Sequence, residues 1–154
     1  MPKLDATDKR LLELLQKNSK VNVKEIAEQL NLTKTPVYER IKRYEREGVI
    51  DRYVAIINMD AIEHLMVVFC YVSLEKQKLD EIEKFSRAVE EMPEVIEGYL
   101  LGGADDFLLK VIVKDLQAYH EFSSGKLAAL PNVSNIRSSF VLHEIKRSSV
   151  VPLL

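Results

Sequence analysis

The sequence is poor in the features that mark secreted and membrane proteins. Its 154 residues include a single cysteine, Cys70, so no internal disulfide can form. The longest apolar run lies between His64 and Ser73, far short of the roughly 20 residues that cross a bilayer. The amino terminus is polar from Asp5 onward and lacks the apolar core of a secretory signal. We therefore expect a cytoplasmic protein with no membrane span.

Motifs for metals and for phosphates are also missing. The histidines, His64, His120 and His143, are far apart and have no cysteine pair nearby, which excludes the standard metal spacings. The segment 124–126 resembles the end of a phosphate-binding loop, but His120 stands where that loop needs glycine and Leu127 replaces its Ser/Thr. We expect no metal, no other cofactor and no catalytic residues.

Charge is distributed unevenly along the chain, although the net charge is only −2. Residues 1–57 contain 12 Lys/Arg and 9 Asp/Glu, a net charge of +3, whereas the remaining residues contain 10 and 15, a net charge of −5. The basic part is the candidate for binding a polyanion, and the acidic part would be repelled by one.

Three short helices are predicted in the basic part. Asp5 is placed to cap the first, with Asp8 returning a capping bond, and Asn22 is placed to cap the second, with Glu25 at the reciprocal position. Asn31 tolerates the left-handed backbone that ends a helix, so the chain can turn at once and Leu32 is expected in the core. Thr33 to Pro36 then begin a third helix, a connection typical of the helix-turn-helix motif.

The third helix has one apolar side and one polar side. With a helical rotation of 100° per residue, one inward-facing stripe is formed by Val37, Ile41 and Tyr44. We predict base contacts for Lys34, Thr35, Tyr38 and Glu39, and phosphate contacts chiefly for Arg40, Lys42, Arg43 and Arg46. With the capping residue Thr33, these form the predicted DNA-binding surface. The alternative is a solvated helix face on which Glu39, Glu45 and Glu47 form ion pairs with the neighbouring lysines and arginines.

The carboxy-terminal half alternates strand and helix patterns. Apolar residues on both faces predict a buried strand from His64 to Leu74, and helical spacing follows from Leu79 until Pro93. Further elements are predicted as a hairpin of strands 95–101 and 107–113, a helix over 116–127 that is interrupted or bent near Gly125, and a last strand from Val133 to about Ile145.

This order is the ferredoxin-like βαββαβ arrangement, in which both helices cover one face of a four-stranded sheet. The open face would expose too much apolar surface in a monomer, so we expect the domain to dimerise through its sheet. The predicted fold class is α+β, with a winged-helix-like helix-turn-helix domain at 1–52, a linker at 53–63 and the ferredoxin-like domain at 64–154.

Motifs along the whole chain resemble those of one family. They comprise Leu4-Asp5, Asp8, the stretch LTKTPVYERIKRYEREGVI over 32–50, Tyr53, Pro93-Glu94-Val95, Gly103 to Phe107, Leu130 to Val133, Val141-Leu142, Lys146 and Pro152-Leu153. In order and spacing the chain is similar to the Lrp/AsnC regulators of bacterial and archaeal transcription. The resemblance implies double-stranded DNA as a partner, a homodimer that assembles further, often into octamers, and an amino-acid effector.

The resemblance also implies where the effector binds. In such proteins the effector pocket lies between dimers, which here corresponds to Gly102, Gly103, Ala104 and Asp106 in the loop and to Ser138 and Ser139 in the last strand. Glycine amides suit a carboxylate and an aspartate suits an ammonium group. Family members often have threonine where Gly102 stands, and the alternative for this loop is a plain hairpin turn whose glycines supply positive φ.

Two other functions fit parts of the pattern. An architectural protein could bend or wrap DNA without any effector. Sirohaem-precursor decarboxylases share the two-domain architecture, but they would need a haem-sized pocket lined by His or Arg, which the scattered histidines do not favour.

Overall fold

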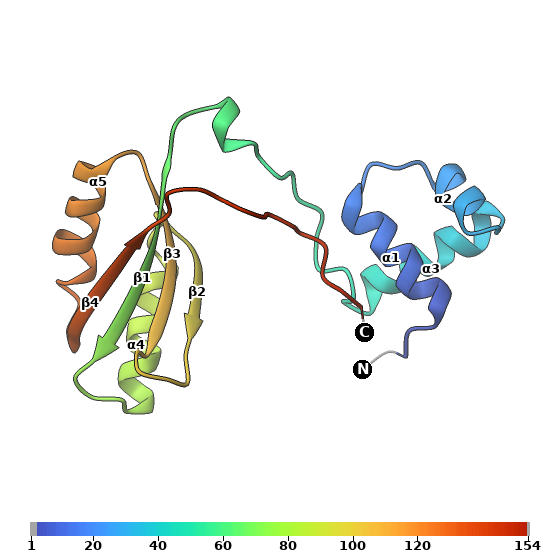
Figure 1. The fold of residues 1–154 in the computed structure, drawn as a ribbon. Helices are drawn as coiled ribbons and strands as arrows, with labels where there is room; N and C mark the ends of the chain where they lie inside the picture. The colour runs from blue at the N-terminus through green and yellow to red at the C-terminus, as the bar shows by residue number, and fades with distance from the viewer. Residues whose placement is uncertain (1–2, 154) are drawn as a thin grey trace. The chain divides into compact units, whose positions relative to one another are not determined.

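Three helices build the amino-terminal part of the chain in the computed structural model, which describes residues 3–153 (Figure 1). They are α1 (Ala6–Lys17), α2 (Val23–Gln29) and α3 (Lys34–Arg46), each where the sequence predicts a helix. Asp5 and Asp8 form the predicted capping box, with amide-to-carboxylate distances of 2.7 and 3.0 Å. Asn22 caps α2 by accepting from the Lys24 amide at 2.9 Å.

One finer capping prediction is wrong. Among the described residues, Glu25 makes no return bond to Asn22. Thr33 does occupy the predicted cap position of α3, without a capping bond from its hydroxyl. Leu32 was also expected in the core, but its side chain is 36% exposed. Asn31 takes the predicted positive φ, 54°, and the Leu32 amide then donates to the Ala27 carbonyl at 2.9 Å, so the backbone closes the turn without burying that side chain.

The core of this helical part lies between the three helices. The predicted inward stripe of α3 is confirmed, because Val37, Ile41 and Tyr44 are all buried. The cluster consists of Leu11, Leu12, Leu15, Ile26, Ala27, Val37, Ile41 and Tyr44. The helices are therefore held together by their apolar sides, and the polar side of α3 is left to face outward.

The chain leaves α3 through Gly48, whose φ of 69° ends the helix as the sequence predicts. Residues 51–58 form neither helix nor strand, and a short 3₁₀ turn follows at Met59–Ala61. Within the described residues this unit contains helices and no paired strand.

The predicted βαββαβ order is confirmed in the second half (Figure 1). Its elements are β1 (Met66–Leu74), α4 (Leu79–Glu90), β2 (Val95–Leu100), β3 (Phe107–Val113), α5 (Leu116–His120) and β4 (Val133–Phe140). All neighbours in the sheet are antiparallel, in the order β2-β3-β1-β4. The α-helical part of α5 ends at His120, and a π-helical turn that contains Gly125 follows over Glu121–Leu127.

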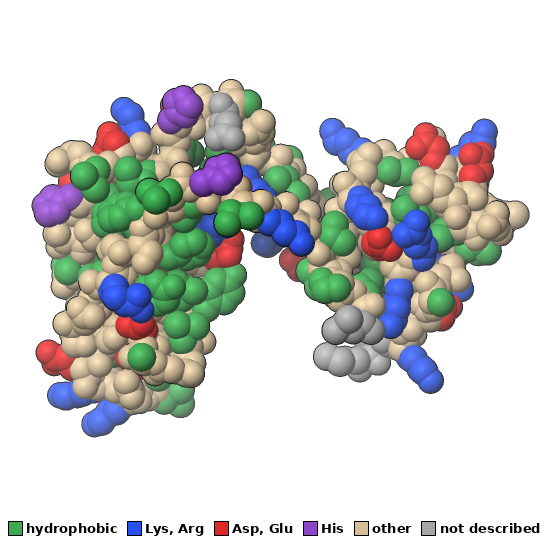
Figure 2. All heavy atoms as spheres, viewed as in Figure 1, with side chains coloured by type: hydrophobic (Ala, Val, Ile, Leu, Met, Phe, Trp, Pro, Cys, Tyr) green, Lys and Arg blue, Asp and Glu red, His purple; other side chains and the backbone are tan. Residues whose placement is uncertain are grey.

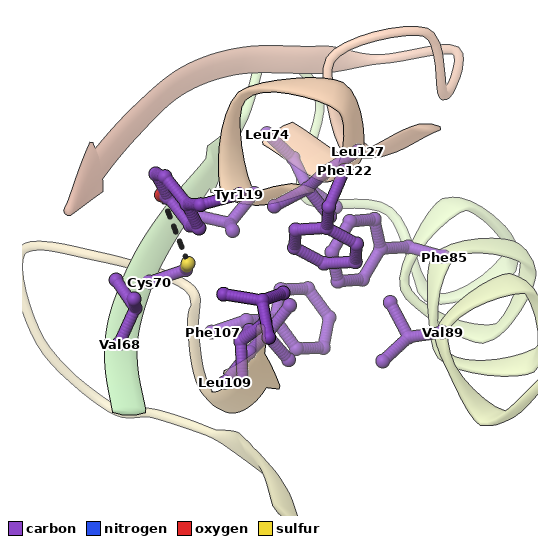
Figure 3. Packing of buried hydrophobic residues seen from close by; sticks show 13 residues of the cluster. Val68, Cys70, Leu74, Phe85, Val89, Phe107, Leu109, Tyr119, Phe122 and Leu127 are labelled. Atoms are coloured by element: carbon purple, nitrogen blue, oxygen red, sulfur yellow. Dashed lines mark hydrogen bonds between the residues drawn. The ribbon is translucent and has the colours of Figure 1, made fainter. Parts of the chain in front are cut away.

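A second core fills the space between the sheet and its helices (Figure 3). The rings of Phe85 on α4 and Phe107 on β3 are 4.4 Å apart between centroids. On the opposite side of this core, the Cys70 thiol lies 3.3 Å from the hydroxyl of Tyr119, which is drawn as a dashed line in Figure 3. Burial raises the pKa of the Cys70 thiol, and burial together with Cys70 raises that of Tyr119 to about 12. Both groups therefore stay neutral at physiological pH.

The end of the chain departs from the predicted domain boundaries. The last strand ends at Phe140 instead of about Ile145, and residues from Ile145 onward belong to the same compact unit as residues up to Ile56. The second unit is Ile57–Glu144. By their contacts, the last residues therefore group with the helical unit, since Leu153 packs against its core. No helix among the described residues is long and apolar enough to span a membrane.

Candidate nucleic-acid interface

One side of α3 carries exposed polar side chains that follow directly from its helical spacing. Tyr38 is 49% exposed, and so is the side chain of Lys42, one turn further along the helix. Most of the predicted DNA-binding residues share this exposure, namely Thr33, Lys34, Thr35, Tyr38, Glu39, Lys42 and Arg46. Figure 2 shows Lys and Arg side chains, with acidic ones among them, over the helical unit. The predicted surface is therefore accessible in this unit.

Lys42 sits in a small network on this exposed side. Its Nζ lies 2.7 Å from a Glu45 carboxylate oxygen and 5.7 Å from the centre of the Tyr38 ring. The hydroxyl of Tyr53 donates to the other Glu45 oxygen at 3.0 Å, which connects the segment after α3 to the helix. The bond to Glu45 raises the pKa of Lys42, so the amine remains a cation at any physiological pH. Tyr53 lies after the end of α3 in the sequence, and residue spacing alone does not predict its hydrogen bond to Glu45.

Arg40 and Arg43 occupy different surroundings from those predicted. Both guanidinium groups bind the carboxylate of Asp8 on α1, Arg43 at 2.8 Å, and Arg40 also binds Asp5 at 3.0 Å. The Arg40 side chain is only 27% exposed, compared with 49% for Lys42. Helical spacing places these arginines on the polar arc, but it cannot show that an acid from another helix reaches them.

Asp8 is the buried centre of this contact, with 2% of its surface exposed. It also accepts a hydrogen bond from the hydroxyl of Tyr44, which is fully buried. Burial alone would raise the pKa of Asp8, but hydrogen bonds from Tyr44, the Asp5 amide and Arg40 outweigh it and lower the pKa. The ionised carboxylate therefore ties α3 to α1 through three side chains.

Asp106 at the end of the loop between β2 and β3 is held on β1 by hydrogen bonds. The Asp106 carboxylate accepts from the Leu74 amide at 2.7 Å, and the Asp106 amide donates to the Val72 carbonyl at 3.0 Å. Neither Gly102 nor Gly103 has a positive φ, so the alternative that they are needed for a positive-φ turn is wrong. A Cβ on either glycine would meet nothing within 4 Å, which leaves open space beside the loop.

The two serines predicted to line the effector pocket point to opposite faces of the sheet, because side chains alternate along a strand. Ser138 pairs across from Cys70 and its hydroxyl contacts the Tyr119 hydroxyl on the helix-covered face. Ser139 pairs across from Phe69 on the other face. Ser138 also lines a cavity of about 360 Å³ between β4 and the π-helical turn, together with Ser123, Ser124, Ala128, Val133, Ser134, Asn135 and Ile136.

Arg137 links the loop to β4 and was missed by the sequence analysis. Its guanidinium lies 2.6 Å from the carboxylate of Asp105 in the loop and 4.0 Å from the centre of the Tyr71 ring. Tyr71 and Arg137 are paired across β1 and β4 on the open face of the sheet. An isolated arginine in a strand gives no signal in the sequence, because its acidic partner is 32 residues away.

The open face of the sheet carries apolar side chains together with the ion pair of Lys110 and Glu97. In β3 the side chains alternate between buried and half-buried positions, and the half-buried ones belong to the face without helices. Figure 2 shows hydrophobic side chains gathered over the sheet. The apolar residues of this face are Val67, Phe69, Tyr71, Tyr99, Leu108 and Ile112. Among residues 3–153, no group of His, Cys, Asp and Glu is placed to hold a metal ion.

Known proteins match both units. The profile of the winged helix-turn-helix DNA-binding domain matches residues 4–51, and that of the Lrp/AsnC ligand binding domain matches residues 67–151. The chain belongs to the Lrp/AsnC family. The leucine-responsive regulatory protein of Escherichia coli is 34% identical over 146 residues, which cover 95% of this chain and 89% of that protein.

Solved structures of Lrp/AsnC-type regulators have the same fold. A transcriptional regulator of Neisseria meningitidis, determined as a complex with L-Met, superposes with a TM-score of 0.91 at 31% identity. An AsnC family regulator from Agrobacterium tumefaciens gives 0.90 at 32% identity. In both comparisons 97% of each chain is covered. The family is one of transcriptional regulators, which agrees with a DNA-facing α3.

Proposed function

We propose that this chain is a sequence-specific transcriptional regulator that places α3 in the major groove of DNA. The observation that carries the proposal is the division of α3 into a buried side, Val37, Ile41 and Tyr44, and an exposed polar side that includes Tyr38 and Lys42. A recognition helix needs such a division, because one side holds it on the domain while the other meets base edges and phosphates.

The exposure and contacts of each residue on α3 indicate which role we propose for it. Lys34, Thr35, Tyr38 and Glu39 lie at the exposed amino-terminal part of α3 and are proposed to contact base edges. Lys42 and Arg46 are proposed to bind phosphates, with Arg43 at the edge of the surface. Arg40 is instead proposed to hold α3 on α1, since its guanidinium already binds Asp5 and Asp8.

Replacing Lys42 tests the DNA proposal. Loss of one phosphate contact lowers the slope of log affinity against log salt by about 0.9. We therefore expect Lys42→Ala to reduce that slope by about this amount on any duplex. Lys84→Ala in α4 is the matched control, because Lys84 also lies 2.7 Å from a glutamate three residues away on its helix. Equal slopes for wild type and Lys42→Ala would contradict the assignment.

Dimerisation is proposed to cover the open face of the sheet. Its apolar side chains would remain in contact with water in a single protomer, which soluble proteins avoid for large patches. A two-fold pair of sheets would bury them and would supply two recognition helices for two half-sites. Further assembly of such dimers, into octamers for instance, is proposed from the resemblance alone.

We also propose an amino acid as the effector. The relatives named above include a leucine-responsive protein and a regulator solved with L-Met, which supports this class of ligand. Gly102, Gly103, Ala104 and Asp106 offer one side of the site, and the cavity lined by Ser138 offers hydroxyl groups on another. Because Ser139 lies on the opposite face from Ser138, these residues would form one pocket only with a second protomer.

Calorimetry with each of the twenty amino acids tests the effector directly. We expect one amino acid to bind with measurable heat and to change either the oligomeric state or the affinity for DNA, because only a ligand that prefers one state can shift the population. If no amino acid binds, while DNA binding persists, the chain would instead be an architectural DNA-binding protein.

A further inference from the structure

The last residues of the chain contact α1 through a paired hydrogen bond. The Val151 amide donates to the Gln16 side-chain oxygen at 2.6 Å, and the Gln16 side-chain nitrogen donates to the Val151 carbonyl at 3.2 Å. A primary carboxamide has both a donor and an acceptor, so it satisfies both backbone groups of one residue, as a neighbouring strand would. The two partners are 135 residues apart in the sequence.

An apolar contact lies two residues beyond this pair. Leu153 is half-buried and packs against the core of the helical unit. By contrast, the side chains of Leu142 and Ile145 are 98% and 93% exposed. The tail therefore makes its apolar contact at its end, while the two large apolar side chains before it are exposed.

The tail gives the helical unit a second covalent connection to the sheet unit. The chain passes from the helical unit to the sheet unit after Ile56 and returns after Glu144. Both connections leave from adjacent strands, because β1 pairs with β4 and the Val141 amide donates to the Val67 carbonyl at 3.0 Å.

We infer that the docked tail positions the helix-turn-helix unit for DNA, with Gln16 and Leu153 as its anchoring residues. A helix-turn-helix unit joined to the sheet unit by one connection can adopt many orientations. A second, anchored connection removes some of these orientations in the protein without DNA. Less orientational freedom is then lost when two recognition helices of a dimer bind two half-sites at once. This inference rests on the proposed DNA-binding function.

Hydrogen exchange of the full-length protein tests the anchor without DNA. We expect the Val151 amide to exchange at least tenfold faster in Gln16→Ala than in wild type, because its acceptor is removed. Gln29→Ala is the matched control, since Gln29 ends α2 in the same unit and is exposed. Unchanged exchange at Val151 in Gln16→Ala would overturn the anchor.

Binding to two duplexes tests the positioning role. Duplexes recovered by wild-type protein from random DNA are prepared with both half-sites or with one half-site scrambled. We expect Gln16→Ala to weaken binding to the two-site duplex by roughly 3–10-fold while the one-site affinity stays within twofold. Equal losses on both duplexes would indicate simple damage to the helical unit, and no loss on either would also overturn the inference. Sizing by light scattering confirms that wild type and variants are compared in the same oligomeric state.

The result separates two failures. If wild type binds neither duplex, the DNA-binding proposal itself is contradicted. If wild type binds both and prefers the two-site duplex, while Gln16→Ala behaves identically, only the positioning role of the tail is wrong. Removing residues 149–154 should reproduce the Gln16→Ala pattern, because it deletes the other half of the same contact.

Discussion

Asp8 is the residue on which the geometry of α3 depends most. It lies near the start of α1, yet its carboxylate receives Arg40, Arg43 and Tyr44 from α3. The sequence indicates only its local role as a partner of Asp5 in the capping box. Its long-range role could not be predicted, because helical spacing describes each helix separately and gives no distance between side chains of two helices.

Replacing Asp8 by Asn should destabilise the helical unit by about 2–3 kcal/mol at pH 7, less than a fully buried ion pair because the arginines are partly exposed. Urea unfolding followed by circular dichroism measures this. Asp51→Asn is the control, since the Asp51 side chain is 85% exposed. If Asp8→Asn lowers the free energy of unfolding no more than the control does, Asp8 does not stabilise the packing of α3 on α1.

Acid should remove the same stabilisation. The pKa of Asp8 is lowered in the folded state, so the unfolded chain binds protons more readily than the folded one. The stabilisation by the ionised Asp8 carboxylate is therefore fully present above the pKa of the unfolded chain, about 3.9, and is lost as the pH falls below that value. The difference in unfolding free energy between wild type and Asp8→Asn should therefore shrink from about pH 5 down to the lowest pH at which the protein still folds. A difference that grows toward low pH would show that the carboxylate is not ionised in the fold.

At the scale of elements, capping and periodicity predicted most of the fold. Asp5, Asn22 and Gly48 mark helix ends where the structure has them. The last strand was predicted too long because Val141 and Leu142 continue its apolar character. In the structure the Val141 amide makes the final bond to β1, at Val67. Pairing with β4 stops at Phe140 opposite Val68 although β1 itself begins at Met66, and the sequence of one strand does not show where its pairing stops.

Gly48 offers a test at this scale. A residue with a side chain pays about 1–2 kcal/mol to hold a positive φ, whereas asparagine tolerates it better. A Cβ at Gly48 meets nothing within 4 Å, so strain is the only cost. We expect Gly48→Ala to lower the free energy of unfolding by about 1 kcal/mol and Gly48→Asn by less. Equal effects of the two substitutions in urea unfolding would contradict a left-handed end of α3.

For the whole molecule, composition and pattern predicted two units but not the contacts that the end of the chain makes. The residues from Ile145 onward join the helical unit through Leu153 and Gln16. Neither contact has a local signal, because a half-buried leucine and a half-buried glutamine are common in any chain. The predicted effector residues show the same limit, since alternation separates Ser138 from Ser139 and the partner of Arg137 could not be foreseen.

The open sheet face gives a prediction for the assembly. Ile112 lies on the half-buried side of β3, and a lysine there would place a charge in the proposed dimer interface. We expect Ile112→Lys to be monomeric by light scattering at concentrations where wild type is at least dimeric. Leu79→Lys is the control, because Leu79 on α4 is 73% exposed. Wild-type assembly in Ile112→Lys would place the interface elsewhere.

The central claim is that the exposed side of α3 reads DNA sequence, and selection from random duplexes tests it most directly. Wild type should enrich a site with two-fold related halves. Tyr38→Ala should change the bases enriched within each half, whereas Lys42→Ala should bind more weakly but enrich the same bases, because phosphate contacts carry no sequence information. The account is contradicted if the folded wild-type protein enriches no sequence, or if Tyr38→Ala and a Thr35→Ala variant both enrich the wild-type site.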